Sequence, residues 1–321
     1  MCIRDRVLTP KSKDISNEYL FNLIQTNEFI QATNVSSGSK MPRADWDYIE
    51  NFPFYIIKSK SEQKAISQVI KTADLAIHTN EKIIAQKELR KKWLMQQLIS
   101  GKKRLFNDEW KSIRIGEVFQ FIKSFSISRE GLQEDNQGSI YCIHYGDIHA
   151  KYCSTFLDFQ NQKNIPQLID GSISIQNCNY LQEGDIVMAD ASEDYQGIGA
   201  AVEVKNLNGK RAIGGLHTLV LRPDKRIISP HFSAYFFLSE KVRNTLRKYA
   251  NGTSVYSVTK TQIHNLSFII PNSLNEQTAI AKVLQAADKE INLLKVKAEK
   301  LRAQKRGLMQ MLLSGKKRIL I

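Results

Sequence analysis

One module occurs twice in this chain, and this repeat constrains the fold more than any other feature. When the sequence is shifted by 214 positions, residues 51–104 align with residues 265–318 without a gap, and the string Ser-Gly-Lys-Lys-Arg ends both copies. With a slip of one residue the match extends upstream, where residues 7–16 parallel residues 220–229. A fixed period of this kind indicates a duplicated structural unit. Residues 105–219 have no counterpart, so we expect a whole second module preceded by the back half of a first.

Each copy predicts a long helix. Apolar residues recur at alternating spacings of four and three, which is the pattern of a coiled-coil seam. A helix of about 33 residues is roughly 50 Å long, more than a small core needs, so we expect two spacer helices that pack together. Asn80, Lys87, Lys91 and Lys305 interrupt the seams, where polar residues weaken packing but fix register. The main seam positions are Ile66, Ile70, Ile77, Leu94, Leu98, Ile280, Leu284, Ile291, Leu308 and Leu312.

Both helices are expected to end at the repeated Ser-Gly-Lys-Lys-Arg string. Its glycine, Gly101 in the first copy and Gly315 in the second, suits the left-handed conformation that often follows a helix. The lysines after each glycine suit the negative end of the helix dipole, and we favour this capping role over a role in binding.

Between the helices the periodicity changes to short runs typical of strands. Four such runs are predicted at residues 139–143, 184–189, 201–204 and 218–221. Ser229 followed by Pro230 predicts the start of a helix that continues to Asn251, because serine caps helices and proline fits their first turn. The apolar stripe of this helix is expected to be core and not a platform for stacked bases: Phe232, Tyr235, Phe236, Val242, Leu246 and Tyr249.

Three polar loops, at residues 123–129, 190–199 and 251–260, are less easily explained by packing. Lysine and arginine bind phosphates, while serine, threonine and tyrosine reach base edges, so loops of this composition on a rigid frame suit the recognition of a DNA sequence. Solvated turns remain the alternative for any single residue. The candidate DNA-binding residues are Lys123, Ser124, Ser126, Arg129, Ser192, Asp194, Tyr195, Thr253, Ser254, Tyr256 and Lys260.

The charge balance supports a polyanionic partner. There are 46 lysines and arginines against 32 acidic residues, a net charge of +14, although a basic solvated surface would give the same count. The cysteines Cys2, Cys142, Cys153 and Cys178 lack the spacing of a zinc site or a redox pair, so we expect reduced structural thiols and no metal. No apolar run approaches the roughly 20 residues that cross a bilayer, which favours the cytoplasm and no membrane partner.

No catalytic site is evident from the sequence. There is no phosphate-binding GxxxxGK[ST] loop, and no string typical of amine methylation. His144, His149 and His217 lack the spacing of a triad or a metal site, so core or surface roles are favoured for them. We expect a protein that binds and does not catalyse.

With these residues laid out, the chain resembles the specificity subunits of type I restriction-modification enzymes. The resemblance covers nearly everything after residue 6 and is carried by four strings: the EQ.AI helix opening, the LMQ.L.SGKKR helix ending, and YLQEGDIVMADASED and GIGAAVEV in the globular segment between the two helices. Each string alone is weak, and together they are specific. The front of the chain departs from the family pattern, because most of a first recognition domain has no counterpart here.

The resemblance implies an α+β protein in which globular mixed α/β target-recognition domains are joined by long antiparallel coiled-coil spacer helices. It implies that each recognition domain binds one half of a bipartite site in double-stranded DNA, and that the helices dock two methyltransferase subunits. Translocase-nuclease subunits then complete the restriction complex. S-adenosylmethionine, ATP and Mg²⁺ would belong to those partners, with no cofactor bound by this chain.

The expected organisation follows from the repeat and the resemblance together. Two alternatives stay open: the recognition portion of a fused restriction-methylation enzyme, which neighbouring genes would distinguish, and a coiled-coil scaffold that does not bind DNA. The expected segments are an artefactual leader at 1–6, the remnant of a first recognition domain at 7–60, a first spacer helix at 61–104, a second recognition domain at 105–272, and a second spacer helix at 273–321.

Overall fold

The computed structural model divides the chain into two compact units. Unit 1 combines Met1–Glu88 with Lys289–Ile321, and unit 2 is Leu89–Asp288. The residues that the structure describes are 7–37, 43–134, 138–152, 154–169 and 179–319. The predicted leader at 1–6 and the cysteines Cys2, Cys153 and Cys178 lie outside the described residues.

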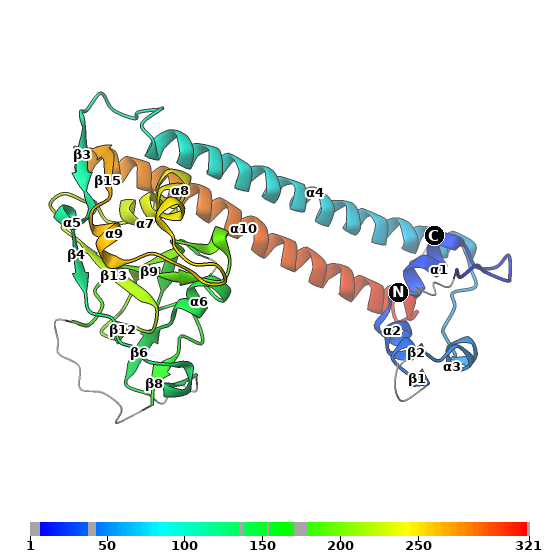
Figure 1. Cartoon of the computed structure of the whole chain (residues 1–321). Coiled ribbons are helices and arrows are strands. Elements are labelled where there is room, and N and C mark those ends of the chain that lie inside the picture. Colours follow the sequence, from blue (N-terminus) through cyan, green and yellow to red (C-terminus); the bar gives the residue numbers. More distant parts are fainter. Residues whose placement is uncertain (1–6, 38–42, 135–137, 153, 170–178, 320–321) are drawn as a thin grey trace. The chain divides into compact units, whose positions relative to one another are not determined.

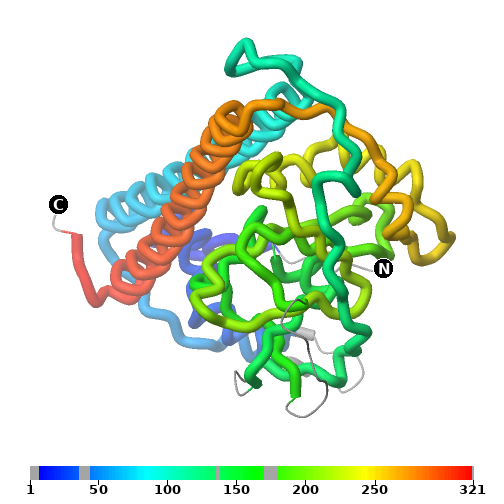
Figure 2. Tube along the Cα trace, turned by 90° about the vertical axis from the view of Figure 1, so that its left-hand side faces the viewer, coloured from blue at the N-terminus to red at the C-terminus, as the bar shows by residue number. Residues whose placement is uncertain are grey.

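Two long helices run through both units, as the repeat predicts. They are α4 (Lys60–Ile99) and α10 (Leu274–Leu313), each of 40 residues, so each is about 60 Å long. The length expected from the seam alone was too short, because six residues, nearly two turns, precede the first seam residue of each copy. In each unit the parts of α4 and α10 lie side by side and antiparallel (Figures 1 and 2).

The predicted seam is the line along which the helices pack. Ile66, Ile70, Ile280 and Leu284 are fully buried, and Leu98, Ile291 and Leu312 are at most 5% exposed. Ile77, Leu94 and Leu308 are half-buried. The polar seam residues bind across the interface as well as interrupting it. Lys87 pairs with Glu290 at 2.5 Å, Lys305 with Asp74 at 2.7 Å, and Lys91 with Asp288, while Asn80 donates to the Leu294 carbonyl at 2.9 Å.

The start of each long helix repeats the same hydrogen bonds. Gln63 accepts from the Ser16 amide at 3.0 Å and donates to the Ile57 carbonyl at 2.7 Å. In the second copy Gln277 accepts from the Ser229 amide at 2.8 Å and donates to the Pro271 carbonyl at 2.9 Å. Both glutamines are fully buried. Because the two make equivalent hydrogen bonds, the repeated sequence forms the same local structure in both copies.

The end of each helix is also the same in both copies. Gly101 and Gly315 have φ of +74° and +69°, the left-handed conformation expected of the glycine in the repeated string. The Lys103 amide donates to the Gln97 carbonyl and the Lys317 amide to the Met311 carbonyl, each at 3.0 Å.

Unit 2 is a mixed α/β domain built on two main sheets (Figure 1). The larger sheet has the strand order β4-β13-β9-β11-β7, and the smaller has the order β12-β6-β8-β5. Two short antiparallel pairs, β15-β3 and β10-β14, complete it. The strand bounds are β3 Trp110–Arg114, β4 Phe119–Ile122, β5 Leu132–Gln133, β6 Ile140–Ile143, β7 Phe156–Asp158, β8 Gln167–Leu168, β9 Ile186–Ala189, β10 Ala191–Ser192, β11 Ala201–Lys205, β12 Arg211–Gly214, β13 Thr218–Pro223, β14 Tyr256–Ser257 and β15 Ser267–Pro271.

All four predicted strands are present as β6, β9, β11 and β13. Strand β9 is central and buried at all four positions, which explains its continuous apolar sequence. The main core of unit 2 joins this sheet to the aromatic side chains of the two helices that follow β13. The helical elements of unit 2 besides α4 and α10 are α5 Ile115–Val118, η1 Arg129–Gly131, α6 Tyr145–Ala150, η3 Tyr195–Gly197, α7 Phe232–Leu238, α8 Glu240–Tyr249 and α9 Lys260–His264.

The single helix predicted after Ser229 is two helices, so that prediction was wrong in detail. Helix α7 begins at Phe232, and Ser229 does not cap it, because the buried Glu203 carboxylate accepts from the His231 and Ala234 amides at 3.2 and 3.3 Å. Ser239 ends α7 and caps α8. The stripe is core as predicted except at Tyr249, which is 49% exposed.

Unit 1 adds short elements at one end of the long helices. They are α1 Asn17–Leu23, α2 Asn27–Thr33, β1 Ser36–Ser37, β2 Arg43–Ala44 and α3 Trp46–Asn51. A small core joins Tyr19, Ile66 and Ile70 to the last turns of α10. Among the helices that the structure describes, none combines the length and apolar character needed to span a bilayer.

Candidate nucleic-acid interface

Two of the three predicted loops, 190–199 and 251–260, are joined into one surface of unit 2. Strand β10 pairs with β14 in antiparallel register, with Ala191 opposite Ser257 and Ser192 opposite Tyr256. The Val258 amide donates to the Asp190 carbonyl at 2.9 Å. The rings of Tyr195 and Tyr256 pack edge to face with centroids 5.3 Å apart. Residues some 60 positions apart in sequence therefore form one continuous patch.

The third loop, 123–129, reaches this patch through the turn between β12 and β13. The Phe125 amide donates to the Gly214 carbonyl at 2.9 Å, so the loop lies against the end of β12. In the same turn, His217 contacts the Asp190 carboxylate at 3.1 Å, and the Asp190 amide donates to the His217 carbonyl. Burial raises the pKa of Asp190. The three loops and the 214–218 turn together form what we call the recognition surface.

The candidate residues differ in how far they are available to a ligand. Ser126, Thr253 and Ser254 are exposed at the tips of their loops, and Tyr195 is 42% exposed. Ser124 and Tyr256 are half-buried. Gly252, with φ of +124°, shapes the tip of loop 251–260, because a Cβ atom there would meet the Val255 carbonyl oxygen at 2.0 Å. The exposed hydroxyl groups of Ser126, Thr253 and Ser254 are therefore accessible to a ligand.

Two candidates are engaged within the fold. Ser192 is 3% exposed, and its hydroxyl donates to the Asp194 carbonyl at 2.7 Å and accepts from the Asp194 amide at 3.2 Å. The Asp194 carboxylate accepts from the Gln196 amide at 2.9 Å. Both side chains shape the loop, a role that loop composition did not distinguish from base recognition.

The three basic candidates differ in whether their charge is already paired within the fold. The ammonium groups of Lys123 and Lys260 are exposed and lie over the rings of Phe125 and Phe121, at 5.3 and 5.2 Å from the centroids. Such contacts orient a cation without neutralising it. The structure gives neither lysine an ion pair among the residues that it describes, so both keep a free positive charge.

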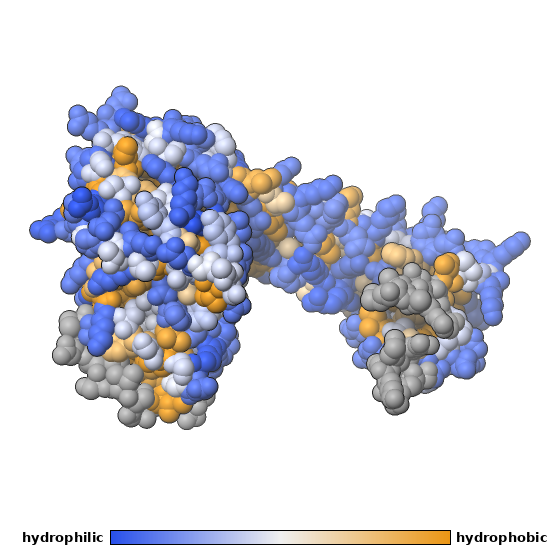
Figure 3. Space-filling view, in the orientation of Figure 1, coloured by the Kyte–Doolittle hydropathy of each residue, from blue (hydrophilic) through white to orange (hydrophobic). Residues whose placement is uncertain are grey.

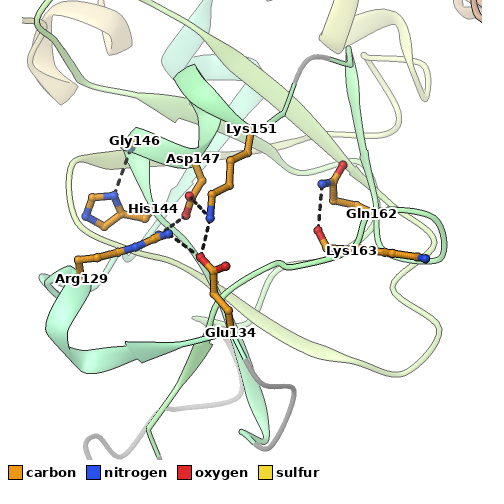
Figure 4. Close-up of polar contacts among 8 residues, drawn as sticks. All are labelled: Arg129, Glu134, His144, Gly146, Asp147, Lys151, Gln162 and Lys163. Atoms are coloured by element: carbon orange, nitrogen blue, oxygen red, sulfur yellow. Dashed lines mark hydrogen bonds and ion pairs between the residues drawn. The ribbon is translucent and has the colours of Figure 1, made fainter. Parts of the chain in front are cut away.

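Arg129 by contrast belongs to an ion-pair network (Figure 4). Its guanidinium binds Asp147 and Glu134, each at 2.7 Å, and Lys151 binds Glu134 at 2.5 Å and Asp147 at 3.2 Å. The hydrogen bond to Asp147 raises the pKa of Arg129. Asp147 lies on α6 with its side chain 4% exposed, so the network anchors loop 123–129 to that helix.

Sequence reasoning missed a cluster of rings at the middle of the recognition surface. The Tyr145 ring contacts three imidazoles, those of His144, His149 and His217, at centroid distances of 4.7, 6.4 and 5.3 Å. The His144 ring accepts from the Gly146 amide at 3.2 Å (Figure 4), and burial lowers the pKa of His144. His144 is half-buried, and His149 and His217 are exposed. Their spacing in the sequence did not indicate that all three contact one tyrosine.

A cleft of about 760 Å³ opens beside this cluster. Tyr145, His149 and Tyr152 form one wall, and the loop around Gly197 forms another. A side chain at position 197 would meet the Ser192 hydroxyl at 2.4 Å, which explains the glycine there. Within the described residues no group of three or more histidine, cysteine or acidic side chains is arranged to hold a metal ion. The thiol of Cys142 is buried in the core, and burial raises its pKa to about 12.

The features described so far are a mixed α/β domain with three polar loops on one surface and long paired helices. A family model, the type I restriction modification DNA specificity domain, matches residues 107–303. The match covers more than half of the chain, so the chain belongs to this family. It is a specificity subunit of a type I restriction-modification system, a recognition subunit, and the fold class and the family resemblance inferred from the sequence are confirmed.

Curated relatives and solved structures of the same family also match the chain. The chain is 25% identical to the type I restriction enzyme MjaVIII specificity subunit of Methanocaldococcus jannaschii, over 97% of this chain and 73% of that protein. The crystal structure of the HsdS subunit from Thermoanaerobacter tengcongensis matches with a TM-score of 0.53 and 15% identity, over 94% of this chain and 70% of that one. The S subunit from M. genitalium matches with a TM-score of 0.54 and 13% identity, over 94% and 73% of the two chains. At these identities the structural matches show the fold alone.

Proposed function

We propose that unit 2 binds one half of a bipartite site in double-stranded DNA and that the recognition surface makes the contacts. The observation that carries this proposal is the convergence of three polar loops on one surface of unit 2, where Lys123 and Lys260 are exposed and have no ion pair among the described residues. Free cations supply sequence-independent affinity for phosphates, and the exposed hydroxyls of Ser126, Thr253 and Ser254 supply hydrogen bonds to base edges. Arg129 contributes chiefly by holding its loop in place.

We further propose that α4 and α10 dock two methyltransferase subunits. Both helices expose large apolar side chains away from the seam, among them Leu75, Leu89 and Trp93 on α4 and Leu293 and Val296 on α10. Figure 3 shows short apolar stretches among the hydrophilic side chains of these helices. Exposed apolar side chains with a tryptophan among them are typical of protein interfaces.

Methylation and cleavage would then belong to partner subunits. We propose that S-adenosylmethionine is used by the methyltransferase subunits, and ATP and Mg²⁺ by translocase-nuclease subunits, in a complex assembled in the cytoplasm. The chain itself would bind no cofactor and would supply the sequence specificity. A protein of this kind needs a rigid spacing between binding sites, and the cross-seam ion pairs of α4 and α10 would provide it.

Reversing the charge of Lys123 or Lys260 to glutamate should weaken binding to duplex DNA regardless of its sequence. Each lysine that contacts a phosphate releases about one counterion, so the slope of log K against log salt should become shallower by about 0.9 per residue. Fluorescence anisotropy with a labelled duplex, titrated at several salt concentrations, measures both quantities. Arg129→Glu needs a parallel stability measurement, because it also breaks the pair with Asp147.

Lys225→Glu is the matched control. Lys225 is exposed on the connection after β13, outside the three loops, and carries no ion pair among the described residues. It should leave the salt slope unchanged. Equal changes for Lys225 and for the loop lysines would indicate a general charge effect and would remove these loops from the proposed interface.

A further inference from the structure

His217 is both exposed and firmly held on the recognition surface. Its side chain is 52% exposed, and its Nδ1 lies 3.1 Å from the Asp190 carboxylate. The His217 carbonyl accepts from the Asp190 amide, also at 3.1 Å, so the two residues are joined through their side chains and their main chains. The imidazole also packs edge to face on the Tyr145 ring, with centroids 5.3 Å apart. Three contacts therefore fix the orientation of an accessible imidazole.

The backbone at His217 is strained. Its φ is +52°, in the left-handed region that a residue with a side chain seldom adopts. The turn before it is anchored to the end of β6 and the start of α6, because the Gly215 amide donates to the Ile143 carbonyl at 2.9 Å and the Tyr145 amide to the Leu216 carbonyl at 3.3 Å. A strained conformation persists only where the surrounding structure enforces it, and such residues are concentrated at functional sites. The strain therefore supports a functional role for this side chain.

The contact with Asp190 decides which nitrogen of His217 carries a hydrogen. An ionised carboxylate can only accept, so Nδ1–H donates to Asp190. The other nitrogen, Nε2, has no hydrogen-bond partner among the residues that the structure describes. When the ring is protonated, Nε2 also becomes a donor. The phosphates of a bound duplex favour this charged form of the ring over the neutral form.

Other charged or titratable groups lie on the elements around His217. Burial raises the pKa of Asp190, and the neighbouring His217 acts in the opposite direction. Burial lowers the pKa of His144, so that ring is neutral at pH 7. The His149 ring donates from Nε2 to a backbone carbonyl at 3.1 Å. His217 thus combines a carboxylate partner with a free second nitrogen. The full set of surrounding groups is Asp190, Tyr145, His144, His149 and, on loop 123–129, Lys123.

We propose that His217 is a specificity-determining residue of unit 2, whose protonated imidazole donates from Nε2 to an acceptor on the major-groove edge of a guanine. Guanine presents two acceptors there, O6 and N7, whereas adenine and cytosine each present an amino donor. Asp190 is a positioning residue, because it acts through the ring that it orients. This inference rests on the proposed binding of DNA by the recognition surface, and it adds a base contact outside the three polar loops.

The full chain and a pool of duplexes with one randomised helical turn, about 10 base pairs, test the inference. Selection gives the preferred sequence, and labelled duplexes in which one guanine at a time becomes adenine are then compared by fluorescence anisotropy. We expect the original chain to discriminate against adenine by about fivefold or more at one guanine, as a single base contact does. His217→Asn should lose this discrimination at that position alone, and should bind an unrelated duplex with an unchanged salt slope.

Asparagine suits this test because it adopts the left-handed conformation readily and does not titrate. The pH profile separates a base contact from a purely structural role. A donor that must be protonated binds more tightly at lower pH, so the original chain should bind the selected duplex about fivefold or more tightly near pH 6 than near pH 8. His217→Asn and Asp190→Asn should each remove most of this difference. The matched control is His78→Gln, which replaces an exposed imidazole of α4 in unit 1 and should keep the profile.

Two results would overturn this inference and leave the proposed DNA binding intact. They are unchanged discrimination at every guanine in His217→Asn, and a pH profile that this variant shares with the original chain. Discrimination lost at an adenine or a cytosine would mean that Nε2 accepts, which also contradicts the inference. A pool that yields no preferred sequence with the original chain would contradict the proposed function itself, and this inference with it.

Discussion

Replacing Glu203 by alanine should lower the free energy of unfolding of unit 2 by about 3 to 5 kcal/mol, the usual cost of removing one partner from a buried charged network. Its carboxylate accepts four hydrogen bonds, from the amides of His231 and Ala234, the Ser233 hydroxyl and, at 2.7 Å, the His231 ring. Without it the start of α7 is left buried with no acceptor. Urea unfolding followed by circular dichroism measures the change.

Glu203→Gln and Glu193→Ala complete the Glu203 experiment. The glutamine keeps one oxygen acceptor and should lose less stability than the alanine. Glu193 is an exposed glutamate of unit 2, so its removal should change stability by less than about 0.5 kcal/mol. If Glu203→Ala were as stable as the original protein, the capping role assigned to Glu203 would be wrong.

Replacing Glu276 by alanine should destabilise unit 2 by about 3 kcal/mol, because it removes a buried carboxylate and leaves two partly buried donors without an acceptor. This fully buried carboxylate accepts from the Leu105 amide and the Trp110 indole, each at 3.1 Å, and so fastens the chain after α4 to the start of α10. Tryptophan fluorescence during urea unfolding measures the change, with Trp110 as one of the three tryptophans of the chain.

The repeat supplies the control for Glu276. Glu62 occupies the same place in unit 1, where it accepts from Arg318 at 2.6 Å and from the Ile319 amide at 3.1 Å. Glu62→Ala should leave the unfolding transition of unit 2 in place. A shift of less than about 1 kcal/mol for Glu276→Ala would contradict the account of this contact.

The long helices and the central strands could be predicted from the sequence because their signals are local and periodic. The seam from Ile66 to Leu98 and the apolar run of β9 each depend on neighbouring residues alone. The start of α7 could not be predicted in the same way. The carboxylate that accepts from its first amides belongs to Glu203, which lies on strand β11 about 30 residues upstream. The local pair Ser229-Pro230 therefore predicted the wrong helix start.

The candidate site was predictable only in part, for a similar reason. Loop composition identified segments that converge on one surface, but it could not show that the Ser192 hydroxyl is turned inward or that Arg129 is held by the buried Asp147. The tyrosine and three histidines at the middle of the surface come from α6 and a distant turn. These residues come together only because distant strands pair, and the spacing of residues in the sequence does not predict which strands pair.

The central claim is that this chain supplies the sequence specificity of a methyltransferase. The most direct measurement is to produce the chain together with its cognate methyltransferase in a host that lacks adenine methylation, and to sequence the methylated genome. The account predicts an adenine-methylation motif that disappears when the chain is omitted, and that weakens when Thr253, Ser254 and Lys260 are replaced together by alanine. Methylation that is the same with and without the chain would contradict it.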